Sequence, residues 1–448
     1  MNREFKIEFE SGFTREEAIK EASRCLQCKV ASCRTGCPVN NAIPDFIKSI
    51  KEENYETGLG AIQEHSYLPA ICGRVCPQEK QCEQACVLNK KGKPIRIGKL
   101  ERYLGDLNLE RKIEKKSPVY PPVAVIGSGP AGLSAAVQLS QLGHAVTIFE
   151  GEQEAGGVLM HGIPEYRLPK DIVRREIEHL KELGVDFRYG VIVGENLLLE
   201  DIFAEGFKAV FIGTGAGSPR ALNIPGEKLH GVMFSTFFLQ TANLVNLGAL
   251  PLAELPISSG DHVVVIGAGN VAMDVARTAI RLGAEVTILN RQSDKDMTAR
   301  EVESEEAKAE GAKFLHHTAP LEIEGERRAE GIRCAPTQVK MTESGKKELV
   351  FLTDQAFTLK AEKIVIAIGQ QPFRRIVSTS SGFEVGTNGV LITNAQGMTT
   401  REGVFAAGDV VHGPATVVQA MGEGRRVARE IHDWIVKEKD KKESLVAK

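Results

Sequence analysis

The chain has 448 residues, 44 of them glycine, and this length predicts about three domains rather than one hydrophobic core. Its 56 lysines and arginines nearly balance its 59 aspartates and glutamates, which excludes the basic excess of a nucleic-acid-binding surface. The sequence contains no run of 18 apolar residues, and its charged first residues are not followed by the apolar stretch of a signal peptide. We therefore expect a cytoplasmic protein without nucleic-acid or membrane partners, whose clustered cysteines bind metal instead of forming disulfides.

Eight of the nine cysteines fall in the first hundred residues of the chain. They form two groups of four: Cys25, Cys28, Cys33 and Cys37, and then Cys72, Cys76, Cys82 and Cys86. The first group, followed by Pro38, is close to the bacterial ferredoxin sequence C-x2-C-x2-C-x3-C-P, whose fourth cysteine binds a different iron–sulfur cluster from the first three. Division by spacing alone gives two all-thiolate sites of four ligands each. Zinc is the alternative metal, because zinc sites also use C-x2-C pairs.

Residues 123–150 and 263–290 repeat one pattern. Each copy contains a β-branched apolar run, a glycine turn, a segment with helical periodicity and a second short strand. This pattern predicts a βαβ unit in which the N-terminus of the first helix faces a pyrophosphate. The candidate binding residues are Gly127, Ser128, Gly129, Pro130, Ala131 and Gly132 in the first copy, and Gly267, Gly269, Asn270 and Val271 in the second, where Ala272 replaces the third glycine. Two such motifs in one chain predict two dinucleotide sites.

The two copies end differently. The first ends on Glu150, whose carboxylate can accept hydrogen bonds from the ribose hydroxyls of FAD or NAD. The second ends on Asn290 and Arg291, which removes the acid and supplies a cation for a 2′-phosphate. We therefore predict FAD at the first site and NADPH at the second, with NADH as the alternative. A solvated arginine at a strand end is the other interpretation of Arg291.

A segment far along the chain completes the predicted FAD site. Residues 400–409 predict a strand that ends in Gly408-Asp409, where the aspartate can bind the ribityl chain of a flavin. Residues 415–420 predict a helix start whose N–H groups, at Thr416 and Val417, face the flavin pyrimidine oxygen. Two further apolar strands end in glycine turns, at 210–215 and at 364–369 with Gly369. Ordinary buried strands followed by glycine turns are the alternative, but their order suggests crossings between two nested nucleotide domains.

With these motifs in order, the chain resembles the small subunit of bacterial glutamate synthase. It resembles equally the N-terminal half of dihydropyrimidine dehydrogenase and the large subunit of NADH-dependent ferredoxin:NADP oxidoreductase. Besides the two dinucleotide motifs, the resemblance rests on Cys-Gly-Arg-Val-Cys-Pro at 72–77, Ile-Arg-Ile-Gly-Lys-Leu-Glu at 95–101, and a segment at 156–169 that includes Gly157 and Arg167. It implies an α/β protein with an α-helical iron–sulfur domain followed by two nested Rossmann-like domains. The expected ranges are 1–118 for two 4Fe–4S clusters, 119–250 and 372–437 for FAD, 251–371 for NAD(P)H, and 438–448 for a charged tail.

The resemblance also implies a specific pairing of cluster ligands. One 4Fe–4S cluster takes Cys25, Cys28, Cys33 and Cys86, and the other takes Cys37, Cys76, Cys82 and Glu101. This set leaves Cys72 without a metal and disagrees with the division by spacing. The crossed position of Cys37 agrees with the ferredoxin pattern. Many NADPH-using relatives carry Tyr-Arg-Arg at the end of the second repeat, of which this chain has one arginine, Arg291.

The activity implied is that of an electron-input subunit, in which NADPH reduces FAD and the clusters pass electrons to a separate partner. That partner is a glutamate synthase large subunit or a ferredoxin-type subunit with flavin and an iron–sulfur centre. No catalytic acid or base is predicted, because hydride transfer to a flavin needs none. Cys334 is the only cysteine outside the first hundred residues, so a thioredoxin-reductase-like dithiol is not expected. The alternatives are an electron-bifurcating subunit and a non-catalytic electron-wire or scaffold subunit.

Overall fold

The computed structural model describes residues 8, 11–115, 117–341 and 347–446, and it divides into two compact units. The main unit contains Glu8–Met160, Arg167–Ser218 and Gln371–Lys448. The inserted unit contains His161–Tyr166 and Pro219–Gln370. Among the described residues, no helix is both long and apolar enough to cross a bilayer.

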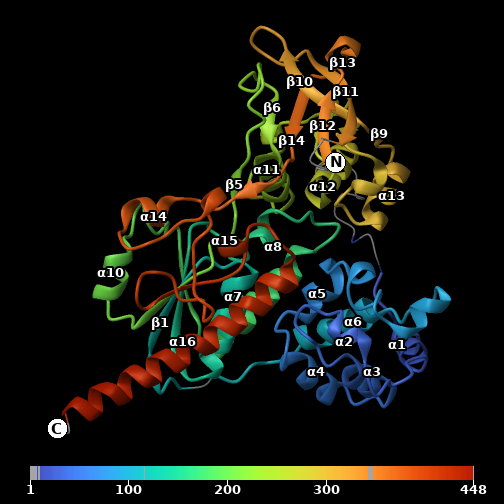
Figure 1. Cartoon of the computed structure of the whole chain (residues 1–448). Coiled ribbons are helices and arrows are strands. Elements are labelled where there is room, and N and C mark those ends of the chain that lie inside the picture. Colours follow the sequence, from blue (N-terminus) through green and yellow to red (C-terminus); the bar gives the residue numbers. More distant parts are fainter. Residues whose placement is uncertain (1–7, 9–10, 116, 342–346, 447–448) are drawn as a thin grey trace. The chain divides into compact units, whose positions relative to one another are not determined.

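The main unit begins with an all-helical part, drawn in blue in Figure 1. Its helices are α1 (Arg15–Ala22), α2 (Ser32–Thr35), α3 (Ile43–Lys51), α4 (Tyr55–Gln63), α5 (Pro69–Val75) and α6 (Ile97–Leu109), with 3-10 turns η2 (Gln78–Lys80) and η3 (Val87–Lys91). Two glycines let α5 and α6 pack backbone against backbone: a Cβ on Gly73 would lie 2.5 Å from the Arg102 nitrogen, and one on Gly105 would lie 2.3 Å from the Ala70 nitrogen. The expected helical N-terminal domain is therefore confirmed.

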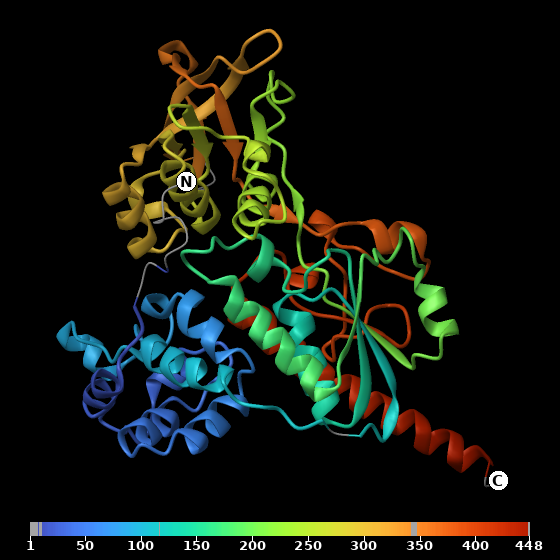
Figure 2. The same cartoon turned by 180° about the vertical axis from the view of Figure 1, so that it is seen from behind.

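The rest of the main unit is built on a five-stranded parallel sheet in the order β16-β4-β1-β2-β3. These strands are β1 (Tyr120–Ile126), β2 (His144–Glu150), β3 (Asp186–Tyr189), β4 (Ala209–Ile212) and β16 (Val404–Ala406). Both views show α7 (Pro130–Gln141) and α16 (Val417–Val446) side by side (Figures 1 and 2), and α9 (Lys170–Leu183) also packs against α7. The strand order reverses beside β1, so the carboxyl ends of β1 and β4 form the crevice where this fold binds ligands.

The inserted unit repeats this architecture with a second parallel sheet in the order β6-β14-β7-β8-β9. Its strands are β6 (Val232–Phe234), β7 (His262–Ile266), β8 (Glu285–Leu289), β9 (Lys313–Leu315) and β14 (Lys363–Ile366). Its helices are α11 (Ser235–Asn246), α12 (Asn270–Arg281) and α13 (Glu301–Glu310). An antiparallel sheet adds β10 (Thr318–Glu324), β11 (Gly331–Met341), β12 (Lys347–Phe351) and β13 (Phe357–Lys360).

The remaining elements are short. They are α8 (Val158–His161), α10 (Leu199–Ala204), α14 (Arg375–Thr379), α15 (Asp409–His412), β5 (Ser218–Pro219), β15 (Gln370–Gln371), η4 (Leu252–Glu254), η5 (Asp294–Asp296), η6 (Thr353–Gln355) and η7 (Thr387–Gly389).

Two boundaries differ from the sequence-based expectation. Residues 219–250 were expected in the first part of the FAD domain, but β6 pairs with β14, and this range belongs to the inserted unit. The change of unit therefore falls between residues 218 and 219 rather than at 250. The range 438–448 was expected as a separate charged tail, whereas α16 continues as one helix to Val446.

Candidate functional site

The turn after β1 has the geometry that a dinucleotide pyrophosphate requires, and each glycine has a different role. Gly127 has φ +93, which allows the tight turn. A Cβ on Gly132 would lie 1.9 Å from the Gly127 carbonyl oxygen, so only glycine lets α7 begin this close to the strand. A Cβ on Gly129 would meet no atom within 4 Å, and this open space is where the backbone can approach a phosphate. Pro130 and Ala131 are buried in the first turn of α7.

Glu150 ends β2 beside this turn. Its Oε2 accepts hydrogen bonds from the Ser128 backbone N–H at 2.9 Å and from the Ser128 hydroxyl, and its Oε1 accepts from the Glu152 N–H at 2.9 Å. The Ser128 hydroxyl in turn accepts from the Gly156 N–H at 2.9 Å. The carboxylate is thus held at the strand tip where a ribose would lie.

The segment at 156–169, one of those on which the family resemblance rests, packs against the same turn. Gly157 has φ +53, and a Cβ there would lie 2.9 Å from the Gly129 Cα, so the two backbones meet beside the proposed pyrophosphate position. Arg167 is half-buried at the start of the next stretch of the main unit.

Gly408 and Asp409 follow β16 at the same edge of the sheet. Gly408 has φ +78, and its N–H donates to Glu423 Oε2 at 2.9 Å on α16. Burial raises the pKa of Asp409 to about 6; the Ala415 N–H, which donates to Oδ1 at 3.1 Å, lowers it, and the Glu423 carboxylate raises it further.

Thr416 caps the N-terminus of α16. Its hydroxyl and the Gln419 side chain form a reciprocal capping box, with the hydroxyl donating to Gln419 Oε1 at 2.7 Å. The helix itself begins at Val417. A Cβ on Gly424 would lie 2.1 Å from the Ala131 carbonyl oxygen, so glycine lets α16 pack against the helix of the first motif. The structure thus brings both predicted parts of the FAD site together.

Asp409 gives a pH-dependent prediction. The folded state holds its proton more tightly than the unfolded chain, where aspartates titrate near pH 3.9, so stability is lost as pH rises from about 4 through about 6. We expect Asp409→Asn to raise the thermal midpoint of the FAD-free protein at pH 8 and to leave it unchanged at pH 4. Calorimetry of this variant beside Asp433→Asn, an exposed change on α16, checks the effect. Equal midpoints for both variants at pH 8 would contradict it.

The inserted unit carries the second motif. Gly267 has φ +136, and a Cβ there would lie 2.3 Å from the Ala367 carbonyl oxygen at the end of β14. Gly269 precedes α12, where Asn270 Oδ1 accepts from the Arg300 N–H at 2.8 Å and Val271 is 41% exposed. Gly369 follows β14 with φ +102, and a Cβ there would meet no atom within 4 Å.

Asn290, which stands where the first motif has Glu150, forms hydrogen bonds within its own turn. Asn290 is buried, and its side chain donates to the Ser293 carbonyl at 3.0 Å and accepts from the Gln292 N–H at 3.1 Å. Arg291 is exposed next to it. At the position where the first motif has a carboxylate, this strand tip has the buried amide of Asn290 followed by an exposed cation.

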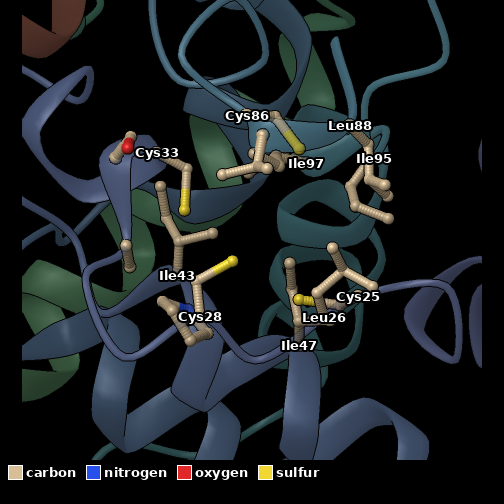
Figure 3. A pocket seen from close by; sticks show the side chains of 14 residues that line it. Cys25, Leu26, Cys28, Cys33, Ile43, Ile47, Cys86, Leu88, Ile95 and Ile97 are labelled. Atoms are coloured by element: carbon tan, nitrogen blue, oxygen red, sulfur yellow. The ribbon is translucent and has the colours of Figure 1, made fainter. Parts of the chain in front are cut away.

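Three neighbouring cysteines and a fourth from more than fifty residues later line one cavity in the helical part of the main unit. Figure 3 shows the sulfur atoms of Cys25, Cys28, Cys33 and Cys86 pointing into this space. Its remaining wall is mainly apolar and includes Ile43, Ile47, Ile95 and Ile97. Burial raises the pKa of Cys33 to about 11 and raises that of Cys25, so these thiols are neutral until a metal displaces their protons.

A second, more buried group surrounds Glu101. Burial raises the pKa of Glu101 to about 8, although Asn41 Nδ2 donates to its Oε1 at 3.3 Å. Burial raises the pKa of Cys37 to about 11 and raises that of Cys82, and the Glu101 carboxylate adds to both shifts. The pKa of Cys76 is raised by a hydrogen bond with Cys72, by burial, and by the neighbouring charges of Cys72 and Glu101.

The structure brings together residues of each ligand set expected from the resemblance, and their binding of clusters stays a prediction. Two further residues lie beside the second set. Cys72 lies beside Cys76, and its sulfur accepts from the Ser66 hydroxyl at 3.8 Å, so it borders the second group without belonging to the expected set. Asn41 contacts Glu101 and was not predicted, because one asparagine has no distinctive spacing. In the described part of the chain, no three His, Cys, Asp or Glu side chains could hold a single metal ion. Thiols spread around a cavity fit a four-iron cluster better than the tight tetrahedron of one zinc ion.

The two dinucleotide folds and the cysteine-lined helical part define a class of protein: a flavin- and nicotinamide-dependent oxidoreductase with an N-terminal iron–sulfur domain. The family model described as pyridine nucleotide-disulphide oxidoreductase matches residues 121–424. The model described as dihydropyrimidine dehydrogenase domain II, 4Fe-4S cluster, matches residues 2–113. The chain therefore belongs to the pyridine nucleotide-disulphide oxidoreductase family, within the group that includes the glutamate synthase small chains.

Individual relatives support this assignment. The Glutamate synthase (NADPH) small chain of Azospirillum brasilense is 34% identical over 94% of this chain and 90% of its own length. The NAD-dependent dihydropyrimidine dehydrogenase subunit PreT of Escherichia coli is 35% identical over 96% of this chain and 97% of its own. A longer relative from Escherichia coli, 34% identical over 94% of this chain, is covered over 66% of its length. Mycobacterium tuberculosis FprA in complex with NADPH shares the fold, with a TM-score of 0.60 at 22% identity over 72% of this chain and 86% of FprA.

Proposed function

We propose that this protein is the NADPH-oxidising electron-input subunit of a larger complex of the glutamate synthase type. The observation that carries the proposal is that the first dinucleotide site and the cysteine-lined cavity belong to one compact unit. When bound, FAD converts a hydride into single electrons and the 4Fe–4S clusters carry them.

The residues of the main unit prepare the flavin site. Glu150 would accept hydrogen bonds from a ribose, and the open space at Gly129 would let a pyrophosphate approach the backbone, which supports the proposal. The N–H groups of Val417 and Val418 begin α16 and carry the partial positive charge of a helix N-terminus, and we infer that they would face the pyrimidine ring of a bound flavin. Cys25, Cys28, Cys33 and Cys86 hold one cluster, and Cys37, Cys76, Cys82 and Glu101 hold the other.

Contacts within the main unit link α16 to the second cysteine group. The Ser66 hydroxyl lies 3.8 Å from both the Cys72 sulfur and the Met421 sulfur on α16. A Cβ on Gly422 would lie 2.6 Å from Val39, two residues after Cys37. The helix that starts at the flavin site therefore touches the surroundings of the Glu101 group. These contacts support the Glu101 group as the cluster site nearer the flavin.

Nucleotide preference gives a direct prediction. The relatives above include both an NADPH-named and an NAD-named protein, so Arg291 is the residue to test. We expect Arg291→Ala to raise KM for NADPH at least about tenfold, because a charge-assisted contact to a 2′-phosphate contributes about 1.5–3 kcal/mol, and to change KM for NADH less than about twofold. Steady-state kinetics beside Lys295→Ala, an exposed cation nearby, checks this. Equal changes for both nucleotides would contradict a phosphate-binding role.

The identity of the larger complex is tested by anaerobic purification from the native source, followed by mass spectrometry of the associated chains. We expect a large subunit with a glutaminase domain. A smaller subunit with flavin and a 2Fe–2S centre would instead assign the chain to an electron-bifurcating transhydrogenase. Recovery of this chain alone, at concentrations where the complex should persist, would contradict a subunit role.

A further inference from the structure

Two arginines of α16 converge on one neutral oxygen in the main unit. Arg425 and Arg429 lie about one helical turn apart, and the Nε of each donates to Oε1 of Gln138 on α7, at 3.1 Å and 3.2 Å. Residues four apart share one face of a helix. The two guanidinium cations repel each other at this separation, and the amide of Gln138 supplies no charge that would offset the repulsion.

Tyr67 reaches the same oxygen from the turn before α5. Its hydroxyl lies 3.1 Å from Oε1 of Gln138 and 2.8 Å from Oε1 of Gln141, and Cζ of Arg425 lies 5.3 Å from the centre of its ring. Gln138 is 5% exposed and Tyr67 is 8% exposed, so packing holds both side chains in place. Burial raises the pKa of Tyr67 despite the nearby cations of Arg425 and Arg429, so its hydroxyl remains a donor.

A further arginine adds positive charge at the same turn. Burial, Arg425 and Arg34 lower the pKa of His65, and the neighbouring carboxylate of Glu64 raises it. Arg34 is half-buried on α2, whereas Glu64 is exposed. Positive charge from two separate helices, α2 and α16, therefore acts on the turn that carries His65 and Tyr67.

The two convergent arginines have no carboxylate partner. Within the described part of the chain, neither Arg425 nor Arg429 forms an ion pair, and their polar side-chain contacts end at Gln138. A guanidinium has five N–H groups, so four on each arginine remain available to water or to a ligand. Arg426 lies between them in the sequence but donates to the Ala395 carbonyl at 2.9 Å, so it belongs to a different contact.

We propose that Arg425 and Arg429, beside the Tyr67 hydroxyl, form a binding site for a phosphate dianion. Two cations match the charge of a dianion, and guanidinium groups bind phosphate oxygens through paired N–H groups. A carboxylate has one charge and two oxygens, so it would leave one guanidinium without a partner. The site lies outside both dinucleotide turns and goes beyond the proposed function, since it requires neither flavin nor nicotinamide chemistry.

A bound phosphate would strengthen the contact between α16 and the turn before α5. Tyr67 follows Ser66, whose hydroxyl lies 3.8 Å from both the Cys72 sulfur and the Met421 sulfur. Neutralisation of the two arginines removes their mutual repulsion, so α16 should pack more firmly against this turn. We therefore expect phosphate to raise the thermal midpoint of the protein above the value in sodium chloride of equal ionic strength.

The test titrates inorganic phosphate at pH 7.5 into the anaerobically purified full chain by isothermal titration calorimetry, at constant ionic strength. Saturating FAD and NADP+ are present, because they exclude phosphate from the two dinucleotide turns. We expect one phosphate per chain with a Kd below about 1 mM. Arg425→Gln with Arg429→Gln should weaken binding at least about tenfold, because the changes remove charge-assisted hydrogen bonds. Arg426→Gln, an exposed change on the same helix, is the matched control and should leave the Kd unchanged.

Three outcomes overturn the proposal: no saturable phosphate binding by the wild type, unchanged binding by the double variant, or an equal loss in Arg426→Gln. Tighter binding of succinate than of phosphate also overturns it, because the site would then select a dicarboxylate. Circular dichroism shows whether the double variant folds. If it does not, Arg429→Gln alone, an exposed change, replaces it, again with a loss of at least about tenfold expected.

Discussion

Replacing Gly132 by alanine is expected to remove FAD from the protein. The added Cβ would lie 1.9 Å from the Gly127 carbonyl oxygen in the turn and 3.3 Å from a methyl group of Val125, which is buried in β1. The backbone of α7 must therefore move away from the strand, which costs about 1–3 kcal/mol as overpacking and displaces the N–H groups that face the pyrophosphate. We expect flavin content per chain to fall at least about tenfold.

The measurement is flavin content after purification in excess FAD, with the thermal midpoint of each sample. The matched control is Gly60→Ala in α4, where the added Cβ meets no atom within 4 Å. The second motif has a buried Ala272 at the position of Gly132, so its helix already accommodates this methyl group. A Gly132→Ala protein that retains full flavin would show that the close approach at the first motif is not needed for binding.

The second large effect is expected at the cysteines. Cys82→Ala should lower the iron content from about eight to about four atoms per chain, because a 4Fe–4S cluster needs four protein ligands and this change removes a buried thiolate from the expected set. Cys72→Ala should leave the iron content unchanged if Glu101 is the fourth ligand. Both cysteine side chains are buried, so both changes remove a buried sulfur from the packing. A difference in iron content between the two variants therefore reports the loss of a cluster ligand.

Iron and acid-labile sulfide analysis of anaerobic protein gives the answer, and circular dichroism confirms that both variants fold. Because Cys72 lies against Cys76, the result for Cys72 decides between the ligand set from the resemblance and the division by spacing. Loss of about four iron atoms in Cys72→Ala, with no loss in Glu101→Ala, would assign the position to Cys72.

Much of the fold was predictable because its signals are local. Gly127, Gly129 and Gly132 lie within six residues, and their turn is fixed by backbone sterics, so the motif alone predicts the strand, the turn and the helix. The domain boundary was not predictable in this way. β6 is three residues long, and it belongs to the inserted unit only because β14, more than a hundred residues later, pairs with it.

In the candidate site, too, contacts between residues that are distant in the sequence could not be predicted from spacing. Spacing groups Cys86 with Cys82, whereas the structure places Cys86 in the cavity with Cys25. The chain between Cys86 and α6 lines the same cavity as the stretch that contains Cys25. Only the family resemblance predicted that Cys86 lies with Cys25. Asn41 was missed because its hydrogen bond to Glu101 spans sixty residues.

The most direct test of the central claim is an anaerobic titration of the cluster-loaded protein with NADPH, followed by optical absorbance and electron paramagnetic resonance. We expect the flavin absorbance to bleach and signals of reduced iron–sulfur clusters to appear in the same samples. A flavin that stays oxidised under NADPH but is reduced by dithionite would contradict the account and would favour a non-catalytic scaffold.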